Sequence, residues 1–341
     1  MSKELKPRIL RLEIEEDGGG KTIKEYLKQR IGFSSKQLSR FKYRRDGILV
    51  NGEKRYVNYA LSAGDVLELR LTQGGEPVEE DQDGPGGRGT GGYLPARDGR
   101  LQKIWAPPAR WLAEGHPLRI LYEDEDILAA DKPSGVVCHP SPGHFDDTLS
   151  NQVAEHLGRI GQELDVRVTG RLDRDTSGIV IFALNTETAA QLIRQRERSM
   201  MSKLYIARVR GHFSDRGEEA AGTVDRPLRR KGPDSFLMVT AEDGKPARTH
   251  YRVLEEMEDG STLAACRIEH GRTHQIRVHM ASICHPLIGD CLYGEESSED
   301  GAGGQGPLML HAFRAELVQP FTGKKICLEA PLPDWAGALH L

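Results

Sequence analysis

Residues 170–185 read Gly-Arg-Leu-Asp-Arg-Asp-Thr-Ser-Gly-Ile-Val-Ile-Phe-Ala-Leu-Asn and contain the longest strongly apolar run of the chain, residues 179–184. An apolar run of this length, rich in β-branched and aromatic side chains, predicts a buried strand. Asn185 follows the run directly, and its side chain suits the cap of a helix that begins there. The polar residues before the run are therefore expected in a loop at the edge of a sheet.

Asp173 is the residue of this loop best suited to chemistry. It lies near Arg171 and Arg174, and a carboxylate beside cations stays ionised and can act as a nucleophile. An aspartate in such a loop is also a common turn residue that satisfies backbone groups. Taken alone, Asp173 leaves both interpretations open.

Composition excludes several classes of protein. The 341 residues include 47 Lys+Arg and 51 Asp+Glu, a formal net charge of −4 that argues against a generally basic coating protein. The longest apolar run is far too short to span a bilayer, and no secretory signal is visible at the start. The five cysteines form no CxxC pair, so we expect neither a disulfide framework nor a metal site, and a cytoplasmic location.

The distribution of glycine and charge divides the chain into three segments. Between residues 74 and 92 lie eight glycines and five acidic residues, a composition that cannot bury enough apolar surface to offset its ordering entropy. We therefore expect a small N-terminal α/β domain over residues 8–73, a flexible acidic Gly-rich linker over 74–112, and a larger C-terminal domain over 113–336. A second Gly/Ser/acid-rich stretch, 295–306, is expected to be a surface loop.

The N-terminal segment has the pattern of a compact module. Helical spacing over residues 23–31 is followed by a second expected helix from Ser34 to Phe41. Asn51-Gly52 then indicates a two-residue hairpin, and residues 66–71 alternate as a strand does.

This module is basic, although the whole chain is not. Residues 21–73 contain 12 Lys/Arg and 5 Asp/Glu, a net charge of 12 − 5 = +7. A charge run is ordinarily a solvated helix face, but one-sided charge on a compact module favours attraction to phosphates. Through Ser34-Ser35-Lys36, Val50-Asn51-Gly52 and Gly64-Asp65-Val66 the module resembles the RNA-binding domain named after ribosomal small-subunit protein four. Its candidate RNA-binding residues are Lys36, Arg40, Lys42, Arg44, Arg45, Lys54 and Arg55.

Four longer motifs follow one another in the rest of the chain. They are Asp131-Lys132-Pro133-Ser134-Gly135, Arg171-Leu172-Asp173-x-x-Thr176-Ser177-Gly178, Lys203-Leu204-Tyr205-Ile206-Ala207 and Gly271-Arg272-Thr273-His274-Gln275-Ile276-Arg277-Val278-His279. In this order they resemble the RluA family of RNA pseudouridine synthases. The resemblance implies an α+β catalytic domain around a mixed, mainly antiparallel sheet. Gly170 and His270 depart from the residues frequent in the family, which weakens any inference about RNA sequence preference.

The resemblance also implies roles for particular residues. Asp173 is the essential carboxylate, acting on the sugar, on the base or by proton abstraction, and Tyr205 stacks on the uracil and removes the base-carbon proton. If residues 275–280 form a strand, Arg277 shares a face with Gln275 and His279 and can reach Asp173.

Further side chains are expected to bind substrate. Arg171 is expected to enter the space left by an extruded uridine. The remaining candidate substrate-binding residues are Ile276, Arg174 and Lys203, and basic runs at 194–210 and 226–231 are expected to contact phosphates.

The expected function is isomerisation of uridine to pseudouridine in structured RNA, ribosomal (large subunit) rather than transfer RNA. This reaction needs no cofactor and no metal, and we expect RNA but no membrane as partner, with the protein a monomer. Two alternatives remain: a non-catalytic RNA-binding or ribosome-assembly protein, and a glycoside hydrolase that uses Asp173 and Asp175 as paired carboxylates.

Overall fold

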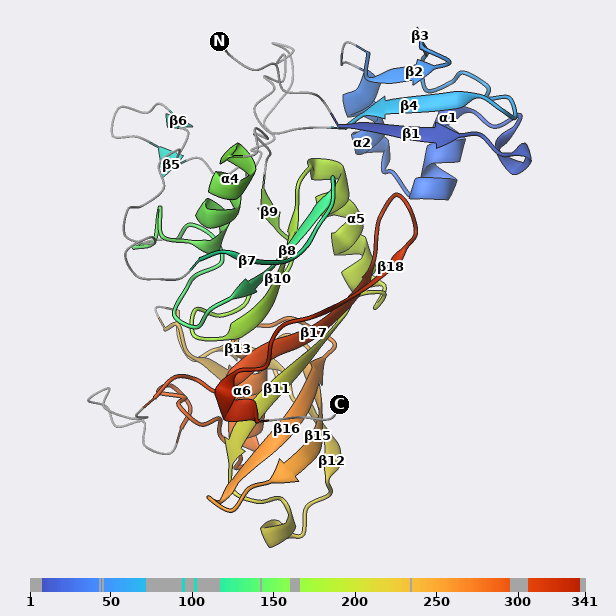
Figure 1. Ribbon diagram of the computed structural model, residues 1–341. Helices are drawn as coiled ribbons and strands as arrows, with labels where there is room; N and C mark the ends of the chain where they lie inside the picture. The colour runs from blue at the N-terminus through green and yellow to red at the C-terminus, as the bar shows by residue number, and fades with distance from the viewer. Residues whose placement is uncertain are drawn as a thin grey trace.

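A ten-stranded sheet and a smaller four-stranded sheet organise the computed structural model of the chain (Figure 1). The structure describes residues 8–42, 44, 46–71, 94–95, 101–102, 117–141, 143–159, 166–233, 235–294 and 306–337. The expected linker over 74–112 lies outside these residues except for the short strands β5 (Leu94–Pro95) and β6 (Leu101–Gln102). Of the expected loop over 295–306, only the last residue is described.

The four-stranded sheet belongs to the N-terminal module, with strand order β1-β4-β2-β3. Its elements are β1 (Ile9–Glu13), the 3-10 turn η1 (Glu16–Gly18), α1 (Ile23–Tyr26), the π-helical turn η2 (Leu27–Ile31), α2 (Ser35–Lys42), β2 (Ile48–Val50), β3 (Glu53–Lys54) and β4 (Val66–Arg70). The helices, the hairpin and the last strand agree with the pattern in the sequence. Strand β1 was not predicted; it pairs with β4 along its whole length and closes the sheet.

Local chemistry explains where these elements begin and turn. The Ser34 hydroxyl accepts a hydrogen bond from the Gln37 amide at 3.2 Å, as expected for a helix cap. Asn51 and Gly52 both have positive φ, 52° and 80°, the conformation that a two-residue hairpin turn between right-twisted strands requires.

The large sheet has the strand order β12-β15-β16-β11-β17-β10-β8-β7, with β18 beside β17 and β9 beside β10. Only β10 and β17 are parallel among its paired strands, so the expectation of a mixed, mainly antiparallel sheet is confirmed. Its strands are β7 (Arg119–Glu123), β8 (Ile127–Lys132), β9 (Arg167–Val168), β10 (Ser177–Ala183), β11 (Ser202–Arg210), β12 (Ala221–Asp225), β15 (Arg248–Glu256), β16 (Ser261–Ile268), β17 (Leu310–Val318) and β18 (Lys325–Glu329).

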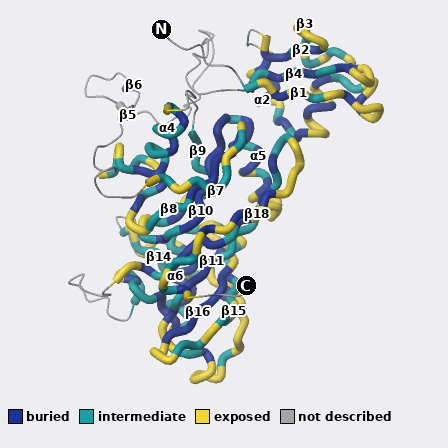
Figure 2. The backbone as a smooth tube through the Cα atoms, viewed as in Figure 1, coloured by how far each residue is buried: buried dark blue, intermediate teal, exposed yellow. Residues whose placement is uncertain are grey.

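Strand β10 is the predicted apolar strand, and it is buried on both faces (Figure 2). Val180 and Phe182 pack in one core cluster with α4 (Leu149–Arg159) and α6 (Gln275–Ser282), whereas Ile179 and Ile181 pack in another with α5 (Thr186–Glu197). Coverage of both faces explains why the strand reads as continuously apolar rather than alternating. The Asn185 side chain caps α5 by accepting from the Thr188 amide at 2.8 Å, as predicted.

Smaller elements complete the unit that contains the large sheet. They are the 3-10 turns η3 (Ser214–Arg216) and η4 (Asp334–Ala336) and a two-stranded hairpin, β13 (Leu228–Arg230) and β14 (Met238–Thr240). Within the described residues, no helix is both long and apolar enough to cross a membrane.

Residues 275–280 form a helix, so the prediction of a strand there was wrong. Ile276 and Met280, one helical turn apart, both pack into the main core, whereas Val278 packs against the β13–β14 hairpin. Each of residues 275–280 is buried. The alternation of apolar and polar residues therefore does not correspond to a buried and an exposed face, and it does not indicate a strand. His279, which lies in this helix, is hydrogen-bonded through Nδ1 to the Thr249 hydroxyl at 2.8 Å.

Side chains also join the N-terminal module to the catalytic part. The Arg8 guanidinium donates to both carboxylate oxygens of Asp126, at 3.3 and 3.0 Å. On α5, Gln191 donates to the Ile31 carbonyl at 2.7 Å and Arg194 donates to the Gln37 side chain at 3.1 Å. These contacts place the beginning of α2 beside α5.

Replacing Gly178 by alanine is expected to destabilise the protein by about 3 kcal/mol. Gly178 has φ +106°, and a Cβ there would lie 2.3 Å from the Ala312 carbonyl oxygen. Chemical denaturation measures the loss. Gly232→Ala is the control, because a Cβ at Gly232 meets nothing within 4 Å, and it should change the free energy of unfolding by less than about 0.5 kcal/mol. Equal stability of the two variants would contradict the close packing of β10 against β17.

Candidate active site

The loop after β8 forms hydrogen bonds with residues that precede and follow Asp173 in the chain. The buried thiol of Cys138 accepts from the Leu172 amide at 3.2 Å and donates to the Leu172 carbonyl at 3.3 Å. Ser134 donates to the Asp175 carbonyl at 2.8 Å, and the Gly135 amide donates to the Arg174 carbonyl at 3.0 Å. The backbone on both sides of Asp173 is thus fixed, while Asp173 itself stays half-buried.

Lys132 is the fully buried cation beneath these two loops. Its ammonium donates to the carbonyls of Pro133, Val136 and Arg174 at 2.9, 2.6 and 2.7 Å. Burial lowers the pKa of Lys132 to about 8, so the side chain is still mainly protonated at neutral pH. Three hydrogen bonds match the three donors of an ammonium and offset the desolvation of the charge. Lys132 belongs to the motif 131–135, which did not by itself indicate a role for it.

Tyr205 lies on β11, and only 7% of it is exposed. It packs in the same core cluster as Leu172 and Ile276. Burial, and after it the negative charge of Asp173, raises the pKa of the Tyr205 phenol. Tyr205 is therefore a neutral phenol close enough to Asp173 to sense its charge.

Lys203 lies two residues before Tyr205 and on the same face of β11. Its ammonium donates to the Ile179 carbonyl at 2.8 Å, and burial lowers its pKa to about 8. A Cβ at Gly170 would lie 4.0 Å from this ammonium. Position 170 therefore borders the Lys203 ammonium, and a Cβ there would make an ordinary van der Waals contact with it.

Arg277 does not pair with Asp173, so that expectation was wrong. Its guanidinium forms a bidentate pair with Asp290, with Nε to Oδ2 at 2.8 Å and Nη2 to Oδ1 at 2.6 Å, and both residues are buried. Burial lowers the pKa of Arg277, but the hydrogen bonds and charge of Asp290, with a smaller contribution from Asp173, outweigh it and leave the pKa raised. Arg277 is thus a fixed cation beside the Asp173 loop.

His274 and Tyr293 are two further residues of the site, and no role was expected for either from the sequence. His274 Nδ1 and the Tyr293 hydroxyl are hydrogen-bonded at 2.7 Å, and that hydroxyl also accepts from the Met238 amide at 2.9 Å. Burial lowers the pKa of His274, against the opposing charge of Asp173. The Arg277 guanidinium lies 5.3 Å from the centre of the Tyr293 ring. His274 belongs to the motif that ends at His279, so its position in that motif was the available signal.

The other candidate substrate-binding residues differ in exposure. Arg171 is exposed and donates to the Thr273 hydroxyl at 3.0 Å, which links the Asp173 loop to the segment before α6. Arg174 is also exposed and pairs with Asp175 at 3.0 Å. Ile276 is buried in the core. The structure thus brings Ile276 beneath the site and leaves the arginines at its rim.

The candidate RNA-binding residues of the N-terminal module divide into two groups. Four of them, Lys36, Arg40, Lys42 and Lys54, are exposed. The half-buried pair is engaged within the module: Arg44 donates to the Arg70 carbonyl at 2.9 Å, and Arg55 pairs with Glu53. Arg45 lies outside the described residues.

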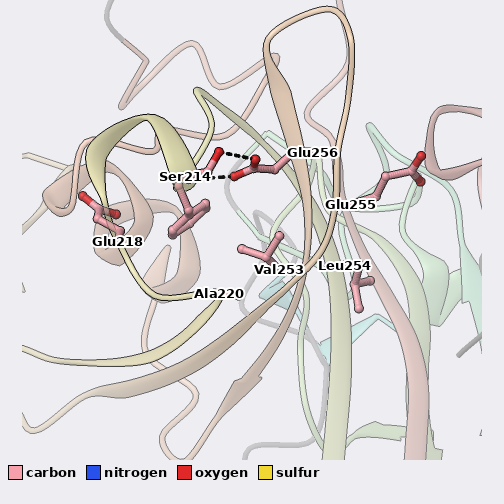
Figure 3. Close-up of a pocket in the computed structure, with 8 residues that line it drawn as sticks. Ser214, Glu218, Ala220, Val253, Leu254, Glu255 and Glu256 are labelled. Carbon is pink, nitrogen blue, oxygen red and sulfur yellow. Dashed lines mark hydrogen bonds between the residues drawn. The ribbon is translucent and has the colours of Figure 1, made fainter.

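A separate pocket of about 350 Å³ lies between η3 and β15 (Figure 3). The residues that line it include Glu218, Glu255 and Glu256, and none of them belongs to the loops around Asp173. The Glu256 carboxylate is held by the Ser214 side chain and amide. Three acidic side chains make this pocket unsuited to a polyanion such as RNA.

The chain is similar to known proteins over much of its length. A family model described as RNA pseudouridylate synthase matches residues 126–282. Ribosomal large subunit pseudouridine synthase D of Nitrosomonas europaea is 41% identical over 231 residues, which cover 67% of this chain and 65% of that protein. The protein of the same name from Pseudomonas aeruginosa is 38% identical over 233 residues, covering 66% of this chain and 71% of that one.

A solved structure agrees with the fold. Human RNA pseudouridylate synthase domain containing 1 superposes with a TM-score of 0.52 at 28% identity, covering 63% of this chain and 84% of that one. The relationship to pseudouridine synthases that the four motifs predicted is confirmed, and the chain belongs to the RNA pseudouridine synthase family.

Proposed function

We propose that this protein converts uridine to pseudouridine in large-subunit ribosomal RNA, with Asp173 as the catalytic carboxylate. The observation that carries the proposal is the fixed loop around Asp173, with a neutral phenol and a buried arginine beside it. The substrate is inferred from relatives whose names specify the ribosomal large subunit. We keep a cytoplasmic location and a monomeric state as predictions.

The reaction rearranges bonds within one nucleotide. The bond from ribose C1′ to uracil N1 breaks, the base turns, and C1′ joins uracil C5, which then loses its proton to a base while N1 gains one. No electron is gained or lost overall, so no redox partner is needed. Asp173 either attacks the ribose or the base or removes a ribose proton, and each route requires an ionised carboxylate within reach of the nucleotide.

Tyr205 is proposed to stack on the uracil and to take part in transfer of the C5 proton. Because its pKa is raised, the phenol holds its own proton at neutral pH and can accept another only by passing that proton on. Asp173, whose charge affects Tyr205 directly, is the carboxylate suited to receive it.

Arg277 is proposed to contribute a fixed positive charge at the site. Its bidentate pair with Asp290 determines the orientation of the guanidinium. Asp290 also accepts from the Leu292 and Tyr293 amides at 3.0 and 3.2 Å. The carboxylate that holds Arg277 therefore also shapes the turn that places Tyr293.

RNA binding is proposed to extend onto the N-terminal module. Its exposed cations Lys36, Arg40 and Lys42 lie on and at the end of α2, a helix suited to contact phosphates. The module is proposed to be the RNA-binding domain that its motifs resemble. Arg171, exposed at the rim of the site, is proposed to occupy the space that the extruded uridine leaves.

Asp173→Asn is expected to abolish pseudouridine formation while the Kd for RNA stays within about threefold, because the amide keeps the shape of the side chain and removes its charge. Release of tritium from RNA labelled at uracil C5 measures turnover. Asp175→Asn is the matched control and should stay within about tenfold of the unmodified enzyme. Turnover by the Asp173 variant would contradict the assignment, and equal loss in both variants would favour paired carboxylates.

Tyr205→Phe keeps the ring and removes the hydroxyl. We expect kcat to fall by about 100-fold or more with little change in the Kd for RNA, because proton transfer by a positioned group contributes about 10²–10⁴-fold. Single-turnover rates at saturating RNA separate the two quantities. A kcat equal to that of the unmodified enzyme would restrict Tyr205 to packing.

The triple variant Lys36→Ala/Arg40→Ala/Lys42→Ala is expected to weaken RNA binding and to lower the slope of log Kd against log salt concentration by about two to three. Filter binding over a range of potassium chloride concentrations measures the slope. Arg216→Ala, an exposed arginine in η3, serves as the control. An unchanged slope in the triple variant would exclude this face of α2 from the RNA-binding surface.

A further inference from the structure

The β13–β14 hairpin presents an exposed aromatic ring. Phe236 precedes β14, and 67% of it is exposed. The turn before it is closed by a hydrogen bond from the Ser235 amide to the Gly232 carbonyl at 3.2 Å, and the Leu237 amide donates to the Ser235 hydroxyl at 3.1 Å. Bonds on both sides of Phe236 hold the backbone so that the ring stays presented to solvent.

Cations accompany this ring. Arg229, Arg230 and Lys231 are exposed on β13 and in the turn that follows it. Arg229 is paired with Asp243 at 2.8 Å. Lys231 lies across the hairpin from Leu237, the residue after Phe236, because the Lys231 amide donates to the Leu237 carbonyl at 2.9 Å. An apolar ring beside positive charge is the composition of a surface that binds single-stranded nucleic acid.

The base of the hairpin is packed against the site. Leu228 and Met238 form a small core cluster with Val278 of α6 and with Tyr293. The Met238 amide donates to the Tyr293 hydroxyl at 2.9 Å, the same hydroxyl that bonds to His274. Val278, together with Tyr293 and His274 near Asp173, therefore fixes the position of the hairpin.

A second attachment fixes the base of the hairpin to α6. His279 Nε2 is hydrogen-bonded to the Arg226 carbonyl at 2.9 Å, and the Arg226 guanidinium donates to the Ser282 carbonyl at 2.7 Å. Gly244 lies so close to Leu228 that a Cβ would approach its backbone nitrogen to 2.7 Å. The hairpin is thus bound to α6 and to its own connecting loop.

We propose that Phe236 stacks on an unpaired base of the substrate RNA, while Arg230 and Lys231 contact the phosphates beside it. The inference rests on the proposed function, because it requires that RNA is bound at Asp173. An extruded uridine leaves its neighbours unstacked, and a flat apolar ring held near the site can replace a lost stacking partner. RNA is favoured over a protein partner because the exposed cations Arg230 and Lys231 lie on the same hairpin as the ring.

Variants of Phe236 test whether the ring itself matters. The probe is an unmodified transcript of large-subunit ribosomal RNA, used with the full-length protein, with Kd measured by filter binding and KM by tritium release. Phe236→Ala and Phe236→Leu are expected to raise both constants about tenfold, whereas Phe236→Trp should stay within about twofold. Leucine is the decisive comparison, since it keeps apolar bulk without a stacking face.

The cations are tested in the same assay. Arg230→Ala/Lys231→Ala is expected to lower the slope of log Kd against log salt concentration by about two, and Arg216→Ala should leave it unchanged. A Phe236→Leu variant that binds as the unmodified protein does would overturn stacking, as would an unchanged salt slope for the phosphate contacts. A change of sedimentation coefficient in Phe236→Ala without RNA would assign the ring to contact between copies of the chain and overturn the proposal.

The two proposals fail in different ways. If the unmodified protein makes no pseudouridine in any RNA, the proposed function fails whatever the hairpin variants do. If it modifies RNA while Phe236→Ala retains its Kd and KM, the hairpin inference alone is wrong.

Discussion

The buried ammonium of Lys132 is the interaction on which the site depends most. It lies where β8 ends and bonds to the carbonyls of Pro133 and Val136 in its own loop and to that of Arg174 in the next. A buried cation with three carbonyl partners is strongly held in place, because loss of any partner leaves its charge uncompensated. The end of the core strand β8 therefore fixes the position of the loop that contains Asp173.

A second constraint comes from the pairing of Arg277 with Asp290. Buried opposite charges stabilise a fold only weakly on balance, but they determine which groups face each other. Here the pair orients Arg277 and, through backbone amides, the turn that holds Tyr293. Tyr293 then connects α6 to the β13–β14 hairpin. Catalytic and peripheral parts of the molecule thus share one network of hydrogen bonds.

Charge is distributed unevenly over this framework. The chain as a whole has a formal net charge of −4, yet residues 21–73 have a net charge of 12 − 5 = +7. Exposed cations stand on α2 and on the β13–β14 hairpin, whereas three glutamates line the pocket beside η3. A polyanion is therefore attracted to α2 and to the β13–β14 hairpin rather than to the whole surface.

Local patterns in the sequence were enough to predict the elements that depend on neighbouring residues. The apolar run of β10, the cap at Asn185 and the hairpin at Asn51-Gly52 formed as expected, because each is decided within a few residues. The order of the four motifs was enough to predict the family. Strand β1 was missed because it is short and is stabilised by β4, which lies more than fifty residues further along the chain.

Only the tertiary structure decided the features that depend on distant partners. The alternating letters of residues 275–280 suggested a strand, but burial on every side removes the contrast on which that pattern relies. Arg277 was expected to bind Asp173, yet Asp290 is its partner, because the turn after α6 brings that carboxylate into bidentate geometry. The sequence by itself identifies the charged residues. The packing of α6 and its neighbours decides which of these charges meet.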